Sequence, residues 1–567
     1  MPPQGGGTEI IMSENTASQK PIKRSTKLFI SGVLVLTVAN VLNKILGLCF
    51  KIPLEHYVGN EGMGYFNQAY TIYTWLYMVS TTGLPTAVSM MISESRAKGN
   101  TLETKRVYKV TMMLFLVIGL VGTTLMMAGA GVFSTLTKSP KAETAIIFIG
   151  PTLFFICISS ALRGYFQGYQ VMVPTAISQL IESFCKFAIG IIFALWALER
   201  GYEIHIVAAY AILGITIGAG LGMFYLLLSK CFFREEKYNE EYLVDGNIAQ
   251  DVSPVKTILK RLIVIAIPIT ISASMLSMTE FIDLTILMRR LQDIGYTEEA
   301  ANALYGNWKT CVVPLFNLPP VLIYPISYSL VPMIRATLTR GERDRAETFM
   351  NMSIRVCAIL SIPCALGMSV MAKPILKLIF SEVGAEMGAP LLTILAPSVF
   401  FVCMLSISNA LLQASGYERK PIISMLAGAA VKLLSTYILV GIPSVGIYGT
   451  PIGTFLCYFT VTVLNTYFLI KYVKVKLDFK GMFLRPLAAG VLCAASAFGS
   501  YKLFGMLIAR FMSDSSAYKL STLIGILVAV LVYLVLIFKL KAITEEDLKT
   551  IPKGEKLLTV MKKIKLM

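Results

Sequence analysis

The stretch "LFISGVLVLTVANVLNKILGLCF", residues 28–50, decides the class of this protein. As a helix it is long and apolar enough to cross the roughly 30 Å hydrocarbon core of a bilayer. It follows the mostly polar residues 1–27, a lead too long for a signal peptide, and no small-residue cleavage site comes after it. Because similar runs recur along nearly the whole chain, the sequence predicts an all-α, polytopic membrane protein.

The composition agrees with this class. Of the 567 residues, 55% are hydrophobic and only 15% are charged, whereas a soluble globular protein carries about 25% charged residues. A net charge of +18 would suggest nucleic-acid binding in a soluble protein. Here the basic residues concentrate in loops on one side of the predicted membrane, so we expect a membrane-lipid environment and no nucleic-acid partner.

Apolar windows bounded by charged or turn-forming residues predict about fourteen membrane-spanning helices. Their approximate bounds are 28–50, 65–92, 110–135, 144–163, 172–197, 206–229, 260–288, 311–334, 352–379, 388–413, 422–440, 446–470, 482–508 and 518–539. With the N terminus inside the cell, the cytoplasmic loops hold most of the 51 Lys and Arg residues, as the positive-inside rule requires. The even count then places both termini in the cytoplasm.

An internal repeat predicts two lobes of six helices. "SSALRGYFQGYQVMVPTAISQ" (159–179) resembles "ISNALLQASGYERKPIISM" (407–425), and Lys186 falls opposite Lys432. Corresponding helices differ by six, so the two lobes are parallel, a common plan in secondary transporters with a substrate site between the lobes. The predicted segments are a disordered cytoplasmic N terminus (1–27), an N-lobe (28–229), a cytoplasmic linker (230–259), a C-lobe (260–470), two appended helices (471–540) and a basic cytoplasmic tail (541–567).

Charged residues inside spans mark the candidate site, because a charge at a helix centre costs roughly 2.5–3.5 kcal/mol on insertion scales. Such a group needs a partner, water or a function. Lys51 and Arg163 lie near predicted interfaces and can snorkel, and Glu182 with Lys186 can form a structural ion pair. The candidates for substrate binding are Lys44, Lys51, Arg163, Gln179, Glu182, Lys186 and Lys432.

Two carboxylates on the seventh predicted helix raise a separate question. Glu280 and Asp283 are like charges three residues apart, an arrangement that is costly unless a cation or a proton is shared. They are candidates for ion coupling, by Na⁺ or H⁺, and pairing with Lys44 or Lys186 across the lobes is equally open. The candidates inside the membrane are mainly cationic, which suits an anionic ligand such as a diphosphate.

The sequence offers no sign of an enzyme. It contains no phosphate-cradling G-x-x-x-x-G-K-[ST] motif, no H-E-x-x-H motif and no G-x-S-x-G elbow. The ten cysteines form no C-x-x-C pair and the two histidines are far apart, so we expect neither a metal site nor a bound cofactor. A membrane glycosyltransferase or polymerase would need a larger loop with convergent carboxylates than residues 230–259 provide.

Two segments resemble a known family. They are "NKILGLCFKIPLEHYVGNEGMGYFNQAYTIYTWLYMVSTTGLPTAVSMMISE" (43–94) and "RGYFQGYQVMVPTAISQLIE" (163–182). Both are similar to the stage V sporulation protein B group of polysaccharide exporters, within the multidrug/oligosaccharidyl-lipid/polysaccharide superfamily that also holds the MurJ lipid II flippases. The resemblance extends over essentially the whole chain. It implies a V-shaped transporter of the bacterial plasma membrane that works by alternating access.

The resemblance also implies a substrate and a route. A polyprenyl-diphosphate-linked sugar, lipid II or a teichoic or capsular precursor, would move from the inner to the outer leaflet. The helices in 471–540 would form a groove for its lipid tail, and Arg163 would help it enter at the cytoplasmic rim. Lys44 matches a cavity arginine of MurJ, but Phe50-Lys51 stands where MurJ has an Arg-Asp pair. The rival within the superfamily, a cation-coupled multidrug antiporter, would favour an acidic cavity.

Overall fold

The protein is a bundle of helices. The computed structural model describes residues 19–81, 83–233, 252–475, 480–508, 510 and 514–540. Throughout these residues there is no β-strand, as the all-α prediction requires. A helix satisfies its own backbone hydrogen bonds, which is why apolar segments of this length adopt it in lipid.

The described residues of the first half of the chain contain nine elements. They are α1 (Gln19–Thr81), α2 (Gly83–Ala97), α3 (Thr101–Ala128), α4 (Ala130–Leu136), the 3₁₀-helix η1 (Pro140–Ala142), α5 (Glu143–Ile149), α6 (Thr152–Gly168), α7 (Val173–Glu199) and α8 (Ile204–Cys231). The long α1 is interrupted at Gly59, whose φ of 66° and ψ of −176° are open to glycine but strained for other residues. This break separates the first predicted span from the second.

The second half of the chain is also helical throughout its described residues. Its elements are α10 (Val255–Asp293), α11 (Glu298–Asn307), the π-helix η3 (Trp308–Val312), α12 (Val313–Phe316), α13 (Leu318–Thr339), α14 (Arg343–Val370), α15 (Ala372–Ile379), α16 (Glu382–Leu395), α17 (Ser398–Ala414), α18 (Arg419–Val440), the 3₁₀-helix η4 (Gly446–Tyr448), α19 (Gly449–Phe468) and the π-helix η5 (Leu469–Val473). The π-helix η6 (Lys480–Leu484), α20 (Arg485–Ile508) and α21 (Asp514–Lys539) follow.

Packing confirms the internal repeat. In the N-lobe α3 packs on α6 and α7 packs on α8, and in the C-lobe α14 packs on α17 and α18 packs on α19. The appended helices α20 and α21 pack on each other, and α20 also contacts α14. The described chain therefore has two lobes with corresponding helix pairs, and two further helices are attached to the second lobe.

The described residues include ten helices that are long and apolar enough to span a membrane, or eleven if the pair α16–α17, bent by 49°, counts as one span. Neither α1 nor α10 is among them. The chain is thus a multi-pass membrane protein, while the number fourteen stays a prediction.

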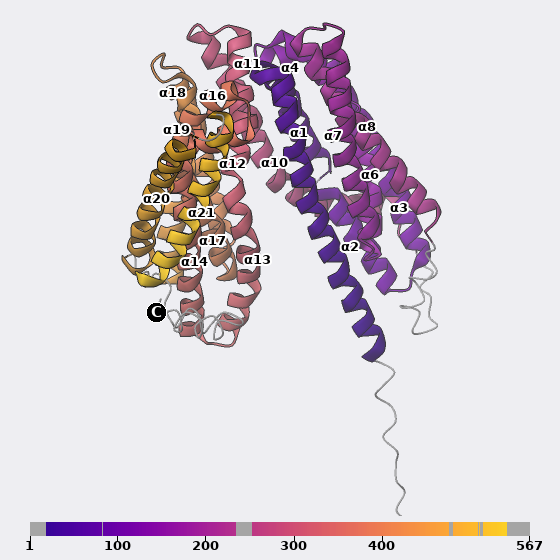
Figure 1. Cartoon of the computed structure of the whole chain (residues 1–567). Coiled ribbons are helices and arrows are strands. Elements are labelled where there is room, and N and C mark those ends of the chain that lie inside the picture. Colours follow the sequence, from indigo (N-terminus) through magenta and orange to yellow (C-terminus); the bar gives the residue numbers. More distant parts are fainter. Residues whose placement is uncertain are drawn as a thin grey trace, which may run out of the picture.

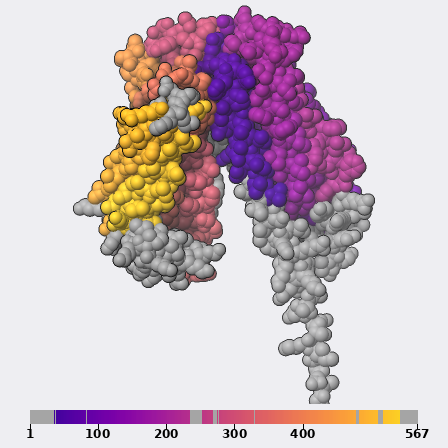
Figure 2. Space-filling model, viewed as in Figure 1, coloured from indigo at the N-terminus to yellow at the C-terminus, as the bar shows by residue number. Residues whose placement is uncertain are grey.

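The two lobes form a V (Figure 1). They meet at the end that carries α4 and α11, which we call the closed end, and diverge toward the other, the open end. The space-filling view shows a deep hollow between them, with α1 along one wall (Figure 2). The predicted topology places the open end in the cytoplasm, and with that orientation the arrangement would be inward-open.

Several predicted boundaries need correction. Residues 19–27 were predicted to be disordered, but α1 begins at Gln19. The C-lobe begins at Val255 rather than at 260, because α10 extends beyond the apolar run. The fourth predicted helix was expected to end at 163, yet α6 continues to Gly168. Residues 1–18, most of the linker (234–251) and the tail (541–567) lie outside the described residues.

Candidate functional site

Contacts between the lobes at the closed end fix the apex of the hollow. The Lys138 Nζ lies 2.7 Å from the Asp293 carboxylate, and the Lys141 Nζ lies 2.8 Å from that of Glu299. At Gly64 the two backbones touch, because a Cβ there would lie 2.2 Å from the carbonyl oxygen of Asn302. A ligand that enters from the open end therefore meets a sealed wall.

Lysines of α1 lead from the hollow toward this wall. Lys44 is exposed, and Lys51 lies two turns, about 10 Å, closer to the closed end on the same helix. Lys51 is partly buried and its Nζ donates to the carbonyl oxygen of Lys309 across the lobes, at 3.2 Å. One turn further, Glu55 accepts a hydrogen bond from the backbone N–H of Ser381 at 3.1 Å, within the lobe contact.

Lys186 of α7 joins this group. Its Nζ lies 5.3 Å from the ring centre of Phe50 and 4.8 Å from that of Tyr70. The faces of aromatic rings attract a cation without neutralising it. In the part of the chain that the structure describes, Lys186 has no ion-pair partner, and its charge repels that of Lys51.

Glu182 does not pair with Lys186, which corrects the expected i,i+4 arrangement. Its Oε1 accepts a hydrogen bond from the Arg163 Nη2 at 2.5 Å. Arg163 is 7% exposed and its Nε also donates to the Ser178 hydroxyl at 3.2 Å. The arginine expected at the cytoplasmic rim therefore belongs to a buried ion pair between α6 and α7, which leaves Lys186 uncompensated.

The C-lobe carboxylates each have a resident lysine. The Glu280 carboxylate lies 3.0 Å from the Lys309 Nζ, and the Asp283 carboxylate lies 3.1 Å from the Lys432 Nζ. Neither Lys44 nor Lys186 is the partner, although both were considered. The two carboxylates of α10 thus avoid mutual repulsion without a bound cation.

The cluster formed by Lys51, Lys186, Lys309 and Lys432 with Glu280 and Asp283 keeps an excess of two positive charges. Both lobes contribute, and Lys44 adds a further exposed cation nearer the open end. Gln179 lies on α7 two turns from Lys186, and its Oε1 is buried without a hydrogen-bond partner among the described residues. Arranged in this way, the apex can hold an anion that carries more than one charge.

Lys309 escaped the sequence prediction. It precedes the eighth predicted span by two residues and was assigned to an outer loop, but the π-helix η3 turns it toward the apex. Its contact with the Glu280 carboxylate on α10 cannot be predicted from a single sequence. Within the described residues, no group of three or more His, Cys, Asp or Glu side chains could hold a metal ion.

Two proteins of similar sequence match most of the chain. Stage V sporulation protein B of Bacillus subtilis (strain 168) is 26% identical over 527 residues, 92% of this chain and 98% of that protein. The lipid II flippase MurJ of the same organism is 23% identical over 423 residues, 72% of this chain and 77% of MurJ.

Solved structures agree in fold. A lipid II flippase MurJ in an inward closed conformation superposes with a TM-score of 0.62 at 16% identity, covering 89% of this chain and 98% of that one. An inward-facing multidrug resistance transporter of the MATE family gives 0.60 at 16% identity, covering 77% and 97%.

Family comparison completes the assignment. The MatE family matches residues 311–438. The family described as "Polysaccharide biosynthesis protein" matches residues 29–338, more than half of the chain. With its two-lobed helical fold, the chain therefore belongs to the polysaccharide biosynthesis protein family, within the multidrug/oligosaccharidyl-lipid/polysaccharide superfamily of transporters.

Proposed function

We propose that this protein is a flippase, not an enzyme, for a polyprenyl-diphosphate-linked cell-wall precursor. Lipid II or a related lipid-linked oligosaccharide would move from the inner to the outer leaflet of the bacterial plasma membrane. Both termini would lie in the cytoplasm, and the lobes would expose the apex to each side in turn. The relative named as a lipid II flippase supports this class of substrate.

The observation that carries the proposal is the uncompensated charge at the apex. A diphosphate esterified at both ends has one negative charge on each phosphate, which matches the two excess positive charges of the lysine cluster. Lys51 and Lys186 come from the N-lobe and Lys309 from the C-lobe. An anion held by all three would therefore relieve the repulsion between the lobes.

The transport cycle follows from this geometry. The headgroup enters at the open end, where the exposed Lys44 meets the diphosphate first, and moves to Lys51, Lys186 and Lys309. The prenyl chain stays in the lipid beside α20 and α21. Neutralisation of the cluster lets the open end close, and separation of the contacts around Gly64 opens the outer side. The membrane potential drives the anionic headgroup outward.

One observation favours a multidrug antiporter instead. The MatE family covers residues 311–438, and a MATE transporter shares the fold. A pump for cationic drugs, however, needs negative charge in its cavity, and this apex has positive charge. Overexpression should therefore leave the resistance of cells to cationic dyes unchanged, and clear dye efflux would favour the antiporter.

Complementation tests the proposal. A bacterium depleted of its own lipid II flippase should survive with the wild-type chain and should die with Lys44→Ala/Lys51→Ala at equal membrane level. Lys98→Ala is the control, because the exposed Lys98 Nζ lies 2.8 Å from the Glu94 carboxylate and is not part of the cluster. Failure of a correctly inserted wild-type chain would exclude lipid II, and full survival with the double variant would refute the diphosphate site.

A further inference from the structure

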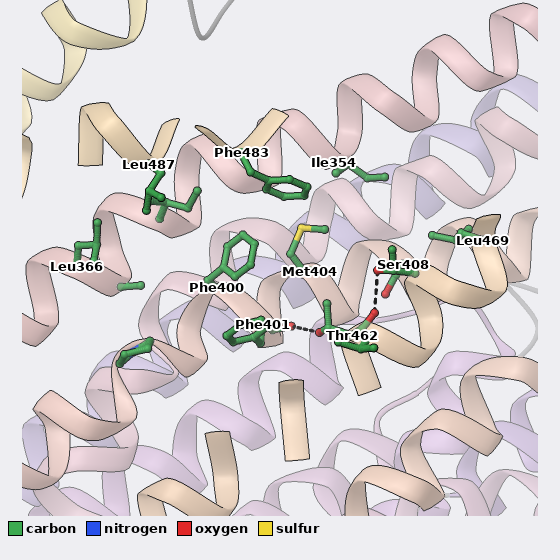
Figure 3. A pocket seen from close by; sticks show the side chains of 15 residues that line it. Ile354, Leu366, Phe400, Phe401, Met404, Ser408, Thr462, Leu469, Phe483 and Leu487 are labelled. Atoms are coloured by element: carbon green, nitrogen blue, oxygen red, sulfur yellow. Dashed lines mark hydrogen bonds between the residues drawn. The ribbon is translucent and has the colours of Figure 1, made fainter. Parts of the chain in front are cut away.

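A second candidate site lies inside the C-lobe. An apolar pocket of about 490 Å³ opens between α14, α17, α19 and the start of α20 (Figure 3). This volume falls within the range of small-molecule pockets, roughly 300–1,000 Å³. Aromatic and branched side chains form its walls, among them Phe400, Phe401, Phe483 and Leu487.

The few polar side chains of this pocket offer nothing to a polar ligand. The Thr462 hydroxyl donates to the carbonyl oxygen of Phe401 at 3.0 Å, and the Thr466 hydroxyl donates to that of Thr462 at 2.8 Å. The Ser408 hydroxyl donates to Leu405 O at 3.1 Å and accepts from the Asn465 amide. Because these hydroxyls are satisfied inside the protein, the pocket suits a hydrocarbon chain rather than water.

A second, polar pocket of about 340 Å³ lies beside the start of α14 and the end of η5. Met350 lines the polar pocket and Ile354, one turn along α14, lines the apolar one. In the same way, Val473 and Leu469 lie one turn apart on η5. The two pockets are therefore neighbours along α14 and η5.

Basic groups dominate the mouth of the polar pocket. Arg343 and Lys474 line it and are exposed, with Glu347 as the one acidic side chain among its lining residues. Lys474 has the left-handed backbone conformation, φ 61° and ψ 35°, which is uncommon for a residue with a side chain. It directly follows the π-helix η5, a type of distortion that is frequent at functional sites.

We propose that this site binds an anionic phospholipid of the leaflet at the open end. One acyl chain fills the apolar pocket, and the phosphate lies between Arg343 and Lys474. Basic pockets between spanning helices on the cytoplasmic side commonly recognise anionic headgroups. The diphosphate of the transported lipid is assigned to the lysine cluster, which leaves Arg343 and Lys474 for the phosphate of another lipid.

The bound lipid would link helices that the transport cycle has to move together. The pocket is lined by α14 and α19 of the repeat and by the appended α20. An acyl chain between them fills a void that would otherwise weaken their packing. The site is independent of the proposed transport substrate and needs only the predicted orientation in the membrane.

The test measures phospholipid binding to the full-length protein in detergent by native mass spectrometry. Phosphatidylglycerol should bind more tightly than phosphatidylcholine with the same acyl chains. Arg343→Gln/Lys474→Gln should weaken phosphatidylglycerol binding by about tenfold or more and remove this preference. Arg340→Gln/Lys256→Gln removes two exposed basic groups that do not line the pockets, and should bind like wild type.

A second variant examines the apolar half. Ala365→Phe places a ring in the pocket and should reduce the binding of both phospholipids. Equal affinities of wild type for the two phospholipids, or unchanged binding in Arg343→Gln/Lys474→Gln, would overturn the proposal. So would displacement of phosphatidylglycerol by equimolar polyprenyl phosphate, which would assign the pocket to the tail of the transported lipid.

Discussion

Lys186 of α7 and Lys432 of α18 occupy matching positions of the repeat, but their surroundings differ. Lys432 lies 3.1 Å from the Asp283 carboxylate of α10, whereas Lys186 lies against the rings of Phe50 and Tyr70. The residue four positions before Lys186 is Glu182, and the residue four positions before Lys432 is Gly428. In the N-lobe the nearby carboxylate is held by Arg163 instead.

This difference shows how two similar lobes can have different roles in binding an anion. Both lobes place a lysine at the same point. The neighbouring carboxylates decide which lysine is left without an ion-pair partner. In the C-lobe Lys432 is neutralised by Asp283, so we expect this pair to have a structural role. In the N-lobe Arg163 forms the ion pair with Glu182, so Lys186 stays available to an anionic headgroup.

Loss of Lys186 should have the largest effect on transport. We expect Lys186→Ala to reduce the rate of flipping of the lipid-linked precursor in reconstituted vesicles by about tenfold to a hundredfold, because a charge-assisted contact to the diphosphate is lost. Lys186→Arg should retain most of the rate, since the charge remains. If Lys186→Ala flips the precursor at the wild-type rate, the two lysines do not differ in the way described.

Removal of Arg163 should make the N-lobe resemble the C-lobe. In Arg163→Met the Glu182 carboxylate is free to pair with Lys186, so the flipping rate should fall by about tenfold. Thermal unfolding in detergent should show a loss smaller than the roughly 3–5 kcal/mol of a buried charge left without a partner, because Lys186 replaces Arg163 as the partner of Glu182. The double variant Arg163→Met/Glu182→Leu should recover both properties. A double variant as inactive as the single one would assign Arg163 a direct role.

Removal of Lys432 should act mainly on stability. Lys432→Ala leaves Asp283 without its ion pair, which costs roughly 3 kcal/mol or more, and the flipping rate should fall only severalfold. In Lys432→Ala/Asp283→Asn the charge imbalance is removed, and we expect near wild-type rates together with restored thermal stability. Persistent loss of flipping in a stable double variant would place Lys432 among the groups that bind the substrate.

The smallest effect should come from the cation composition of the medium. Lys309 and Lys432 already neutralise Glu280 and Asp283, so replacing all Na⁺ by choline at constant membrane potential should leave the flipping rate unchanged. Ionophores that set the potential provide the control. A rate that rises saturably with Na⁺ would indicate that the ion displaces a lysine from these carboxylates.

The sequence predicted the fold more fully than the site. Two parallel lobes could be predicted from hydropathy, from the asymmetry of charge between loops and from the similarity of 159–179 to 407–425. The first two patterns are imposed by the membrane, and the third comes from the internal repeat. Partner choice within the site depends on contacts between helices. Arg163 was expected at the rim because a span of ordinary length ends there, and Lys309 was assigned to a loop because π-helical geometry has no sequence signal.

Binding of the diphosphate group is the most direct test of the central claim, that the uncompensated lysine of the N-lobe holds the substrate. Purified full-length protein in nanodiscs would be titrated with a short-chain polyprenyl diphosphate, and the dissociation constants of wild type, Lys186→Ala and Lys432→Ala/Asp283→Asn compared. We predict weaker binding by about tenfold or more for Lys186→Ala and an unchanged constant for the C-lobe double variant. Unchanged binding in Lys186→Ala, with loss in the double variant, would contradict the account.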